Sequence, residues 1–474
     1  MYCQLEALRH CLPPSVARIL EELPDTLDET YERVLREINK ANRDHARRLL
    51  QCLTVALRPL RIEELAEVLA IDFNAPCHGG IAQLNPNWRW ADQHQAVLST
   101  CSSLIAIVDD GDSKVVQFSH FSVKEYLTSA RLACLSGDVS RYHISLEPAH
   151  TIIAQACLGV LLRLDEHVNK DNVGDTPLAR YAAQYWVDHA GFEKVVSRIQ
   201  DAMEYFFDAD KPHWAAWCRV QMIDERWFSF YPEGFQDPFP LYYASLAGFY
   251  DLAEHLVGKH PEHINARGGL MGTPLVAALH GKHFEVAGLL CRNGAGVDVR
   301  DSSENTLLRQ ASRVLDVVQW LLDHGADVNA QGYNGYSPLH NAVCDGQLQA
   351  FQMLIEHNAD IHIQNAFGMT PLHDAAAGYE IRSDHVDIMQ LLLEHGANPN
   401  ARDNNNSTPL HHSSWSKTGN YPPNRGTVEG TRLLLQHGAI KDAEDNKGRT
   451  PLQLALEHGH EDIATCLKEH GAMR

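Results

Sequence analysis

Histidine side chains are the residues of this 474-residue chain whose number and spacing could most readily support chemistry. The chain has 28 of them, and His340, His373 and His411 each end a Pro-Leu-His string, with His412 following directly. Several imidazoles close together could bind zinc. A histidine that recurs at one place in a repeated string instead indicates hydrogen bonding between repeats or at helix ends. We expect the second role, and we predict no metal site and no cofactor.

Cysteine and phosphate-binding motifs give no sign of catalysis. The eleven cysteines are scattered and none forms a Cys-x-x-Cys pair, which indicates reduced, buried thiols rather than disulfide bonds or a zinc framework. No serine or cysteine has the local motif of an activated nucleophile. The chain also contains no Gly-x-x-x-x-Gly-Lys-Ser/Thr loop to hold a nucleotide. We therefore propose no catalytic residue and expect a protein that is not an enzyme.

The recurring histidines belong to a repeat of roughly 33 residues that runs from about residue 237 onward, in about seven copies. Its clearest copy is Met369–Ala377 followed by Val386–Asp403. Within it, Thr370 is placed to cap a first helix, Leu391–Leu393 to form the apolar face of a second, and Gly396 to end that helix. The order Thr-Pro-Leu-His, Leu-Leu, His-Gly-Ala and Asn-Ala resembles the ankyrin repeat. The resemblance implies a stacked solenoid whose surface binds a protein.

A turn rich in asparagine, aspartate and glycine, such as Gln331–Gly335, connects successive copies and is expected to project from the stack as a finger. Large side chains stand in two adjacent fingers where the repeat usually has polar ones. We expect them on the finger tips as anchors for a protein partner, the alternative being packing between fingers: Tyr333, Tyr336, Phe367 and Met369. Trp415 belongs to one of two inserted segments, 379–384 and 415–425, and is expected to form a second contact or to cover a repeat edge.

The residues before the repeats show helical periodicity interrupted by one hairpin. Helices are predicted from the capped stretch Leu23–Thr30 onward, over about 44–57 and over 62–70, followed by a loop to about residue 90. Strands at 103–108 and 114–118 then flank the acidic turn Asp109–Asp112, and a helix follows at 119–127. Helices followed by a two-stranded wing predict a winged helix. The aromatic stretch from Trp214 to Phe235 is expected to form a hydrophobic joint leading into the repeats.

The predicted fold class is therefore mainly α, with a winged-helix and helical region ahead of an ankyrin-repeat solenoid that has short β-hairpins. The predicted domains are a helical segment at 1–70, a winged-helix-like region at 71–135, a helical linker at 136–236 and about seven ankyrin repeats at 237–474.

Four strings in the first part of the chain resemble the region that follows the nucleotide-binding NACHT domain in fungal NLR-like (STAND) proteins: Leu23–Leu35, Leu57–Leu65, Val116–Leu127 and Tyr181–Ala190. The resemblance implies a winged helix that reports from a repeat sensor to a NACHT module. In that family a winged-helix histidine contacts the β-phosphate of bound ADP. Because Phe118–Tyr126 matches its setting, the resemblance assigns nucleotide sensing to His120. The alternative is a histidine packed at the start of a helix.

Charge and hydropathy argue against two classes of partner, nucleic acids and membranes. The chain carries 61 acidic and 40 basic residues, a net charge of −21, and neither the predicted wing nor the helix before it is basic. Since phosphate contacts dominate nucleic-acid affinity, we expect no nucleic-acid partner and no anionic membrane partner. The first residues have no apolar signal segment, and the longest apolar run, Thr151–Leu164, is too short to span a bilayer. We expect a cytoplasmic protein.

These features together predict a non-enzymatic protein-interaction or scaffold protein, the ankyrin sensor portion of a fungal NLR-like signalling receptor. Two alternatives stay open: the regulatory part of a NACHT NTPase whose catalytic domain lies upstream or in another chain, and a stand-alone ankyrin adaptor. The expected partners are a protein ligand on the ankyrin surface and a NACHT module. No feature of the sequence indicates an oligomeric state.

The missing phosphate loop leads to a direct test. We expect the purified chain neither to bind nor to hydrolyse ATP or GTP, because a single histidine cannot replace the backbone cradle that holds the phosphates. Isothermal calorimetry measures the binding, and a micromolar affinity for either nucleotide would contradict the expectation.

Overall fold

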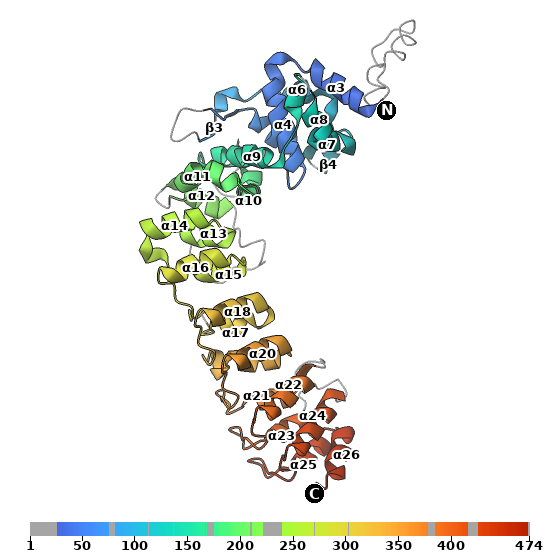
Figure 1. The fold of residues 1–474 in the computed structure, drawn as a ribbon, viewed down its shortest axis with the longest axis vertical. Helices are drawn as coiled ribbons and strands as arrows, with labels where there is room; N and C mark the ends of the chain where they lie inside the picture. The colour runs from blue at the N-terminus through green and yellow to red at the C-terminus, as the bar shows by residue number, and fades with distance from the viewer. Residues whose placement is uncertain are drawn as a thin grey trace. The chain divides into compact units, whose positions relative to one another are not determined.

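The computed structural model describes residues 26–74, 81–111, 113–135, 137–165, 167, 175–208, 211–220, 239–269, 271–301, 303–377, 384–415 and 425–472. Contacts divide the chain into two compact units, residues 1–274 and 275–474. Helices make up most of the described residues of each unit, and the strands lie in the first (Figure 1). This confirms the predicted fold class. Most of the two predicted insertions, and the aromatic residues from Trp227 to Phe235, lie outside the described residues.

The first described element of the first unit is a helix that the capping signals predicted. Thr26 accepts a hydrogen bond from the backbone N–H of Glu29 (3.2 Å) and so caps α3 (Leu27–Glu37). The apolar stripe at helical spacing is buried, with Tyr31 only 3% exposed. The hydroxyl of Tyr31 pairs with that of Ser122 at 2.7 Å, which joins α3 to a helix about 90 residues further along the chain.

A winged helix follows, and the predicted hairpin is its wing. The three-stranded antiparallel sheet has the order β1-β5-β4, with Leu60 opposite Val116 and Ile107 also opposite Val116. The boundary predicted at residue 70 therefore falls inside this fold, because the first helices and β1 belong to it. Its elements, in chain order, are α4 (Arg43–Val55), β1 (Leu60–Arg61), α5 (Ile62–Val68), α6 (Gln93–Cys101), β4 (Ile105–Asp110) and β5 (Ser113–Phe118).

The segment predicted as a loop between residues 72 and 90 is in part a small hairpin. Its strands β2 (Ile71–Asp72) and β3 (Gln83–Leu84) pair antiparallel. A Cβ atom at Gly159 would lie 2.5 Å from the carbonyl oxygen of Ala82, so glycine is needed there for the close approach of helix and backbone. Strands of two residues are too short to leave a periodic pattern in the sequence, and the pattern does not contain the long-range contact with Gly159.

Helices α7 to α12 complete the helical part of the first unit, and α13 and α14 form its ankyrin-type pair. Their bounds are α7 (Phe121–Thr128), α8 (Ala130–Cys134), α9 (Leu146–Leu161), α10 (Leu178–Ala190), α11 (Val195–Phe206), α12 (Pro212–Val220), α13 (Pro240–Ala247) and α14 (Tyr250–Lys259). The described residues include no helix that is both long enough and apolar enough to cross a membrane.

Buried carboxylates connect the winged helix to the helices that follow. Glu67 on α5 is 3% exposed and accepts a hydrogen bond from the backbone N–H of Leu178 at the start of α10 (2.7 Å), while Arg89 pairs with its other oxygen. Burial raises the pKa of Glu67, the bonds to Leu178 and Arg89 acting in the opposite direction. A buried carboxylate that lost either bond would be poorly compensated, so the contact with Leu178 fixes the start of α10 on α5.

An aromatic cluster packs the first ankyrin-type pair against the helical region. The ring centroid of Trp217 lies 5.9 Å from that of Trp186 and 4.9 Å from that of Tyr243 on α13, and Phe249, next to α14, lies 5.9 Å from Trp186. Trp217 and Trp186 have no exposed surface. The expected hydrophobic joint is therefore confirmed for the described part of the aromatic stretch. It explains why the contacts divide the chain after this pair rather than before it.

The second unit is a stack of helix pairs in chain order (Figure 1). The leucine of each Pro-Leu string is buried, from Leu339 to Leu452, and Leu392 on a second helix has no exposed surface. Gly396 takes the predicted left-handed conformation with φ of 91°. The helices are α15 (Pro274–His280, which begins at the division), α16 (Phe284–Arg292), α17 (Leu307–Gln310), α18 (Leu315–Asp323), α19 (Pro338–Cys344), α20 (Leu348–Glu356), α21 (Pro371–Ala377), α22 (Asp384–Glu394), α23 (Pro409–Ser414), α24 (Arg425–Gln436), α25 (Pro451–Glu457) and α26 (Glu461–Glu469).

The aromatic cluster gives a prediction for stability. Replacing Trp217 with alanine should lower the free energy of unfolding by about 3–5 kcal/mol, because a fully buried ring is lost and its N–H no longer donates to the Ala183 carbonyl. Trp88→Ala is the matched control, since Trp88 is 47% exposed, and it should change stability by less than about 1 kcal/mol. Chemical denaturation followed by circular dichroism measures both; equal effects would contradict the packing role.

Candidate partner-binding site

The Pro-Leu-His histidines hold successive repeats together. The Nδ1 atom of His340 accepts a hydrogen bond from the backbone N–H of Ser337 (3.2 Å), and its Nε2–H donates to the carbonyl of Met369 in the next finger (3.1 Å). His373 makes the same two bonds with Thr370 and Ser407, at 3.1 and 3.2 Å. His411 makes them with Thr408 and Arg449, both at 3.1 Å. The predicted inter-repeat role is confirmed.

These histidines are neutral as a consequence of where they lie. Because Nδ1 accepts, the proton is on Nε2, and both ring nitrogens are engaged. Burial lowers the pKa of His340 and of His373 to about 4 and also lowers that of His411. A metal ion could bind this series only by breaking these bonds. His412 is engaged as well, with its Nε2 atom 2.9 Å from a carboxylate oxygen of Asp403.

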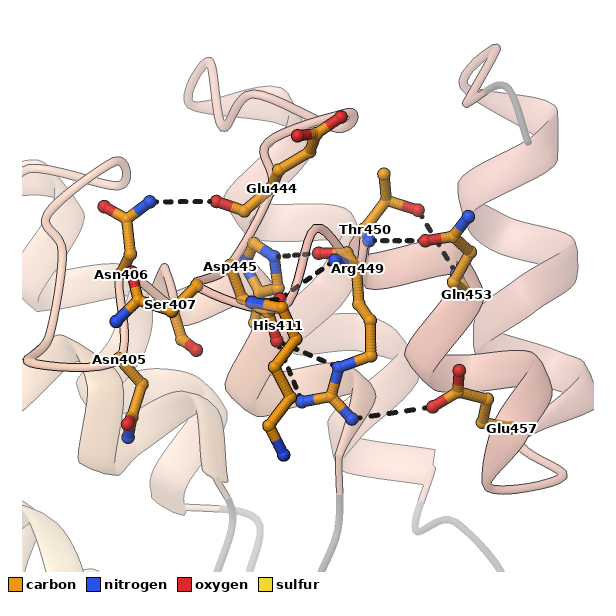
Figure 2. A network of polar contacts seen from close by, with 12 residues as sticks. Asn405, Asn406, Ser407, His411, Glu444, Asp445, Arg449, Thr450, Gln453 and Glu457 are labelled. Atoms are coloured by element: carbon orange, nitrogen blue, oxygen red, sulfur yellow. Dashed lines mark hydrogen bonds and ion pairs between the residues drawn. The ribbon is translucent and has the colours of Figure 1, made fainter.

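One side chain closes most of the finger turns from within. In the finger before α25, an oxygen of Asp445 accepts from the backbone N–H groups of Lys447 (2.8 Å) and Arg449 (2.9 Å), and Figure 2 shows this network with the bond from His411. Three other fingers begin with a residue that acts in the same way. Its side-chain oxygen accepts hydrogen bonds from the backbone N–H groups of the residues two and four positions later: Asp301, Asn365 and Asp403. The turns are therefore defined before any partner binds.

The finger that carries Tyr333 is closed differently. It begins with Gly332, which has no side chain to accept these bonds, and the Asn305 side chain of the preceding finger accepts the backbone N–H of Tyr333 instead (2.9 Å). A Cβ atom at Gly332 would lie 2.6 Å from that Asn305 oxygen. Sequence reasoning did not identify Asn305. The available signal was the glycine at a place where other fingers have aspartate or asparagine.

Hydrogen bonds also connect the fingers to one another. The N–H of Ala366 donates to the Asn334 carbonyl (2.8 Å), and the N–H of Asn404 donates to the Phe367 carbonyl (2.9 Å). Side chains add parallel links, such as Gln331 to the carbonyl of Gln364 at 2.7 Å. The turns before α19, α21, α23 and α25 thus form one continuous row, which we call the finger row.

Two of the predicted anchors lie on the tips of this row. Tyr333 is 60% exposed and Phe367 is 48% exposed. The bond between Ala366 and Asn334 places their fingers next to each other. The tips of the other described fingers carry polar residues, among them Ser303, Asn405 and Lys447. The pair forms a local apolar area on an otherwise polar row, with its backbone already fixed.

Tyr336 and Met369 do not lie on the tips, so that part of the prediction is wrong. Met369 is 7% exposed, and its N–H bonds back to Asn365 (3.0 Å) while its carbonyl accepts from His340. Tyr336 is half-buried, with its ring 5.5 Å from the His340 ring and the guanidinium of Arg309 6.0 Å from its centre. Both residues end their fingers, where the chain turns into the next helix, and the turn brings them against the stack.

Trp415 is exposed but separate from the finger row. It is 39% exposed and follows the last residue of α23, whereas the finger precedes the first residue of the same helix. Its ring lies 6.2 Å from that of His458, so it covers part of the neighbouring repeat. The structure does not bring it together with Tyr333 and Phe367.

His120 is the residue directly before α7, at the helix start that the alternative interpretation expected, but its ring is exposed rather than packed against the helix. Its Nδ1 atom accepts the backbone N–H of Ser122 (3.2 Å) and lies 2.6 Å from the Ser122 hydroxyl. The ring contacts Phe121, which is 71% exposed, and is itself exposed. With Nδ1 used by the helix start, Nε2 is the atom left to donate to a ligand.

The comparisons with known proteins agree with both parts of this description. Residues 31–135 match the winged helix domain described for GPI inositol-deacylase. This match includes α3 to α6, in accord with a winged helix that begins before residue 71. Ankyrin-repeat families match residues 241–332, 339–422 and 424–473, and also 311–355. The chain thus contains a winged-helix domain followed by ankyrin repeats.

Individual relatives cover only parts of the chain. The azaphilone pigments biosynthesis cluster protein L of Monascus ruber is 33% identical over 300 residues, which are 59% of this chain and 61% of that protein. An ankyrin repeat protein of Rickettsia felis is 37% identical over 101 residues, 19% of this chain and 45% of that protein. The ankyrin repeat protein nuc-2 of Neurospora crassa is 32% identical over 110 residues, 10% of its length. This chain therefore spans less than two thirds of each of these relatives.

The buried histidines predict a pH dependence of stability. Their folded-state pKa lies below the ordinary value of about 6.5, so the unfolded chain binds more protons and stability falls as the pH falls from about 6.5 toward 4. Between pH 7 and pH 5, the loss should be about 2 kcal/mol for each of His340 and His373. Denaturation at both pH values measures it.

The variant His340→Gln isolates one of these contributions. Gln453 shows that glutamine can accept the same backbone N–H at this position of the repeat, at 2.9 Å from Thr450. The variant should lose the pH-dependent share of His340, while His395→Gln, at an exposed position, should keep the wild-type dependence. If the stability of His340→Gln depended on pH as the wild type does, the pH-dependent share assigned to His340 would be contradicted, because the two proteins share every other titrating group.

Proposed function

We propose that this chain is a non-enzymatic protein-binding module that captures a protein ligand on its finger row. The observation that carries the proposal is the pair Tyr333 and Phe367, exposed on adjacent tips whose backbones are held by hydrogen bonds. Large aromatic side chains on a rigid support are the usual centres of binding energy, because little conformational entropy is lost when they are covered. The site would act without cofactor or metal.

The winged helix is proposed to report binding to a NACHT-type nucleotide-binding module. The support is the exposed ring of His120. Its Nδ1 atom accepts a hydrogen bond at the start of α7, so its Nε2–H can donate to an anionic oxygen. On this proposal the chain is the sensor portion of a fungal NLR-like receptor. The alternatives are the regulatory part of a NACHT NTPase with its catalytic domain upstream or in another chain, and a stand-alone adaptor.

The charge distribution supports a protein ligand over DNA. Helix α6, which occupies the third-helix position of the winged helix, contains no lysine or arginine, and the wing carries exposed Asp109 and Asp110 near its tip. An acidic wing repels phosphates. We place the protein in the cytoplasm. The name of the Monascus relative links that protein to azaphilone pigment biosynthesis. Our proposal for this chain is limited to protein binding.

The double variant Tyr333→Ala/Phe367→Ala tests the finger row. Each truncation should cost about 2 kcal/mol or more of binding free energy, a loss of about thirtyfold in affinity, because each removes an anchor from the centre of the interface. Folding stability should change by less than about 1 kcal/mol, since both side chains lie on turns outside the core. The measurement is quantitative capture of partners from an extract of the native cells.

The matched control changes polar tips of the same row. Asn405→Ala/Lys447→Ala removes side chains that are exposed on the fingers before α23 and α25 and should retain the wild-type set of partners. Retention of the same partners by the aromatic double variant would contradict the proposed site. A large drop in its melting temperature would show that the two rings stabilise the fold instead.

A further inference from the structure

A short turn after α14 brings together three side chains that the sequence analysis did not consider as a group. His260, Glu262 and His263 each place one possible metal ligand atom within 4.8 Å of the other two. The Nδ1 atom of His260 lies 3.2 Å from a carboxylate oxygen of Glu262, and the Nε2 atom of His263 lies 3.9 Å from the same oxygen. The cluster lies in the first unit, far along the chain from the Pro-Leu-His series.

The turn is built before any ion binds. Pro261 is the first residue of a 3-10 turn (Pro261–His263), where its ring fixes φ, and the N–H of His263 donates to the His260 carbonyl (3.0 Å). Ile264, directly after the turn, is 5% exposed and anchors it in the core. The ring of Phe239 stacks on that of His263 with centroids 4.1 Å apart. Backbone and one ligand ring are thus already oriented.

The spacing of the ligand atoms suits a small transition-metal ion. Zinc binds imidazole nitrogen and carboxylate oxygen at about 2.0–2.2 Å, so two ligand atoms of a tetrahedral site lie roughly 3.3–3.5 Å apart. The observed separations of 3.2 and 3.9 Å bracket this value. The ligand atoms of His260 and His263 lie within 4.8 Å of each other, so side-chain rotation must bring the three atoms onto one ion.

The residue types also suit a cation. Two imidazoles and one carboxylate form a ligand set typical of zinc and related divalent ions.

We propose that His260, Glu262 and His263 form a binding site for a divalent transition-metal ion of the zinc type. Three protein ligands leave one coordination position for water or for a ligand from a partner. Because all three ligands come from one turn, the ion would hold that turn in its present conformation. The proposal is independent of the finger row, which lies in the other unit.

Zinc titration of the full chain tests the site. The chain is first stripped with a chelator, and Zn²⁺ is then added in competition with a colorimetric chelator of micromolar affinity. The wild type should bind one more equivalent of Zn²⁺ than His260→Ala/His263→Ala. Glu262→Gln, which keeps the size of the side chain, should weaken the same equivalent by at least about tenfold, since even partners that only orient metal ligands are worth 10–100-fold.

Controls separate this site from the many other histidines and the cysteines. His395→Ala/His437→Ala removes two exposed histidines that are distant in sequence, and it should bind as many equivalents as the wild type. Co²⁺ in the site should give the visible absorption of nitrogen and oxygen ligation without the intense near-ultraviolet band of thiolate ligation. Without metal, Glu262→Gln should melt at the wild-type temperature, because the Glu262 side chain is 63% exposed.

Two results would overturn the proposal. Equal stoichiometry in the wild type and in His260→Ala/His263→Ala would show that the turn does not hold zinc. A thiolate band in the Co²⁺ spectrum of the equivalent that only the wild type binds would assign that equivalent to cysteine. A loss of Zn²⁺ confined to the two site variants, with partner capture by the finger row retained, supports it.

Discussion

The hydrogen bond that each Pro-Leu-His histidine donates to the next finger is the interaction on which the described ankyrin stack depends. It satisfies the backbone at the start of its own helix through Nδ1 and fixes the end of the following finger through Nε2. One ring thereby sets both the register of a helix and the position of the next turn. It can do so only while neutral, and burial keeps it neutral.

The rigidity of the finger row follows from this constraint. The fingers before α21, α23 and α25 are each fixed at the base by a histidine and closed within by an aspartate or asparagine, and all four fingers of the row are linked to a neighbour through the backbone. The finger that begins with Gly332 replaces the internal closure with Asn305 from the preceding finger. Side chains at the tips therefore need not order a flexible loop when they meet a partner, which lowers the entropic cost of binding.

The winged helix and the first ankyrin-type pair are joined to the intervening helices by different chemistry. Glu67 binds the start of α10 through a buried carboxylate, and the aromatic cluster around Trp217 packs α13 against the helical region. Both contacts are costly to break, the first because a charge would be left unpaired and the second because a cavity would form. These two contacts join the winged helix, the intervening helices and the first ankyrin-type pair within the first unit.

Periodicity and local capping were enough for the sequence alone to determine the helices, the wing hairpin and the repeats, because these depend on neighbours within one repeat or one hairpin. The role of the Pro-Leu-His histidines followed from their recurrence at one place in the repeat. The exposed Tyr333 and Phe367 were also predictable, since each stands at the centre of a turn. Only the tertiary structure decided that Met369 and Tyr336 are withdrawn to the stack, that Asn305 closes a neighbouring finger and that α13 packs on Trp217. These depend on contacts between segments far apart in the chain or on which way a turn directs a side chain, and a linear pattern contains neither.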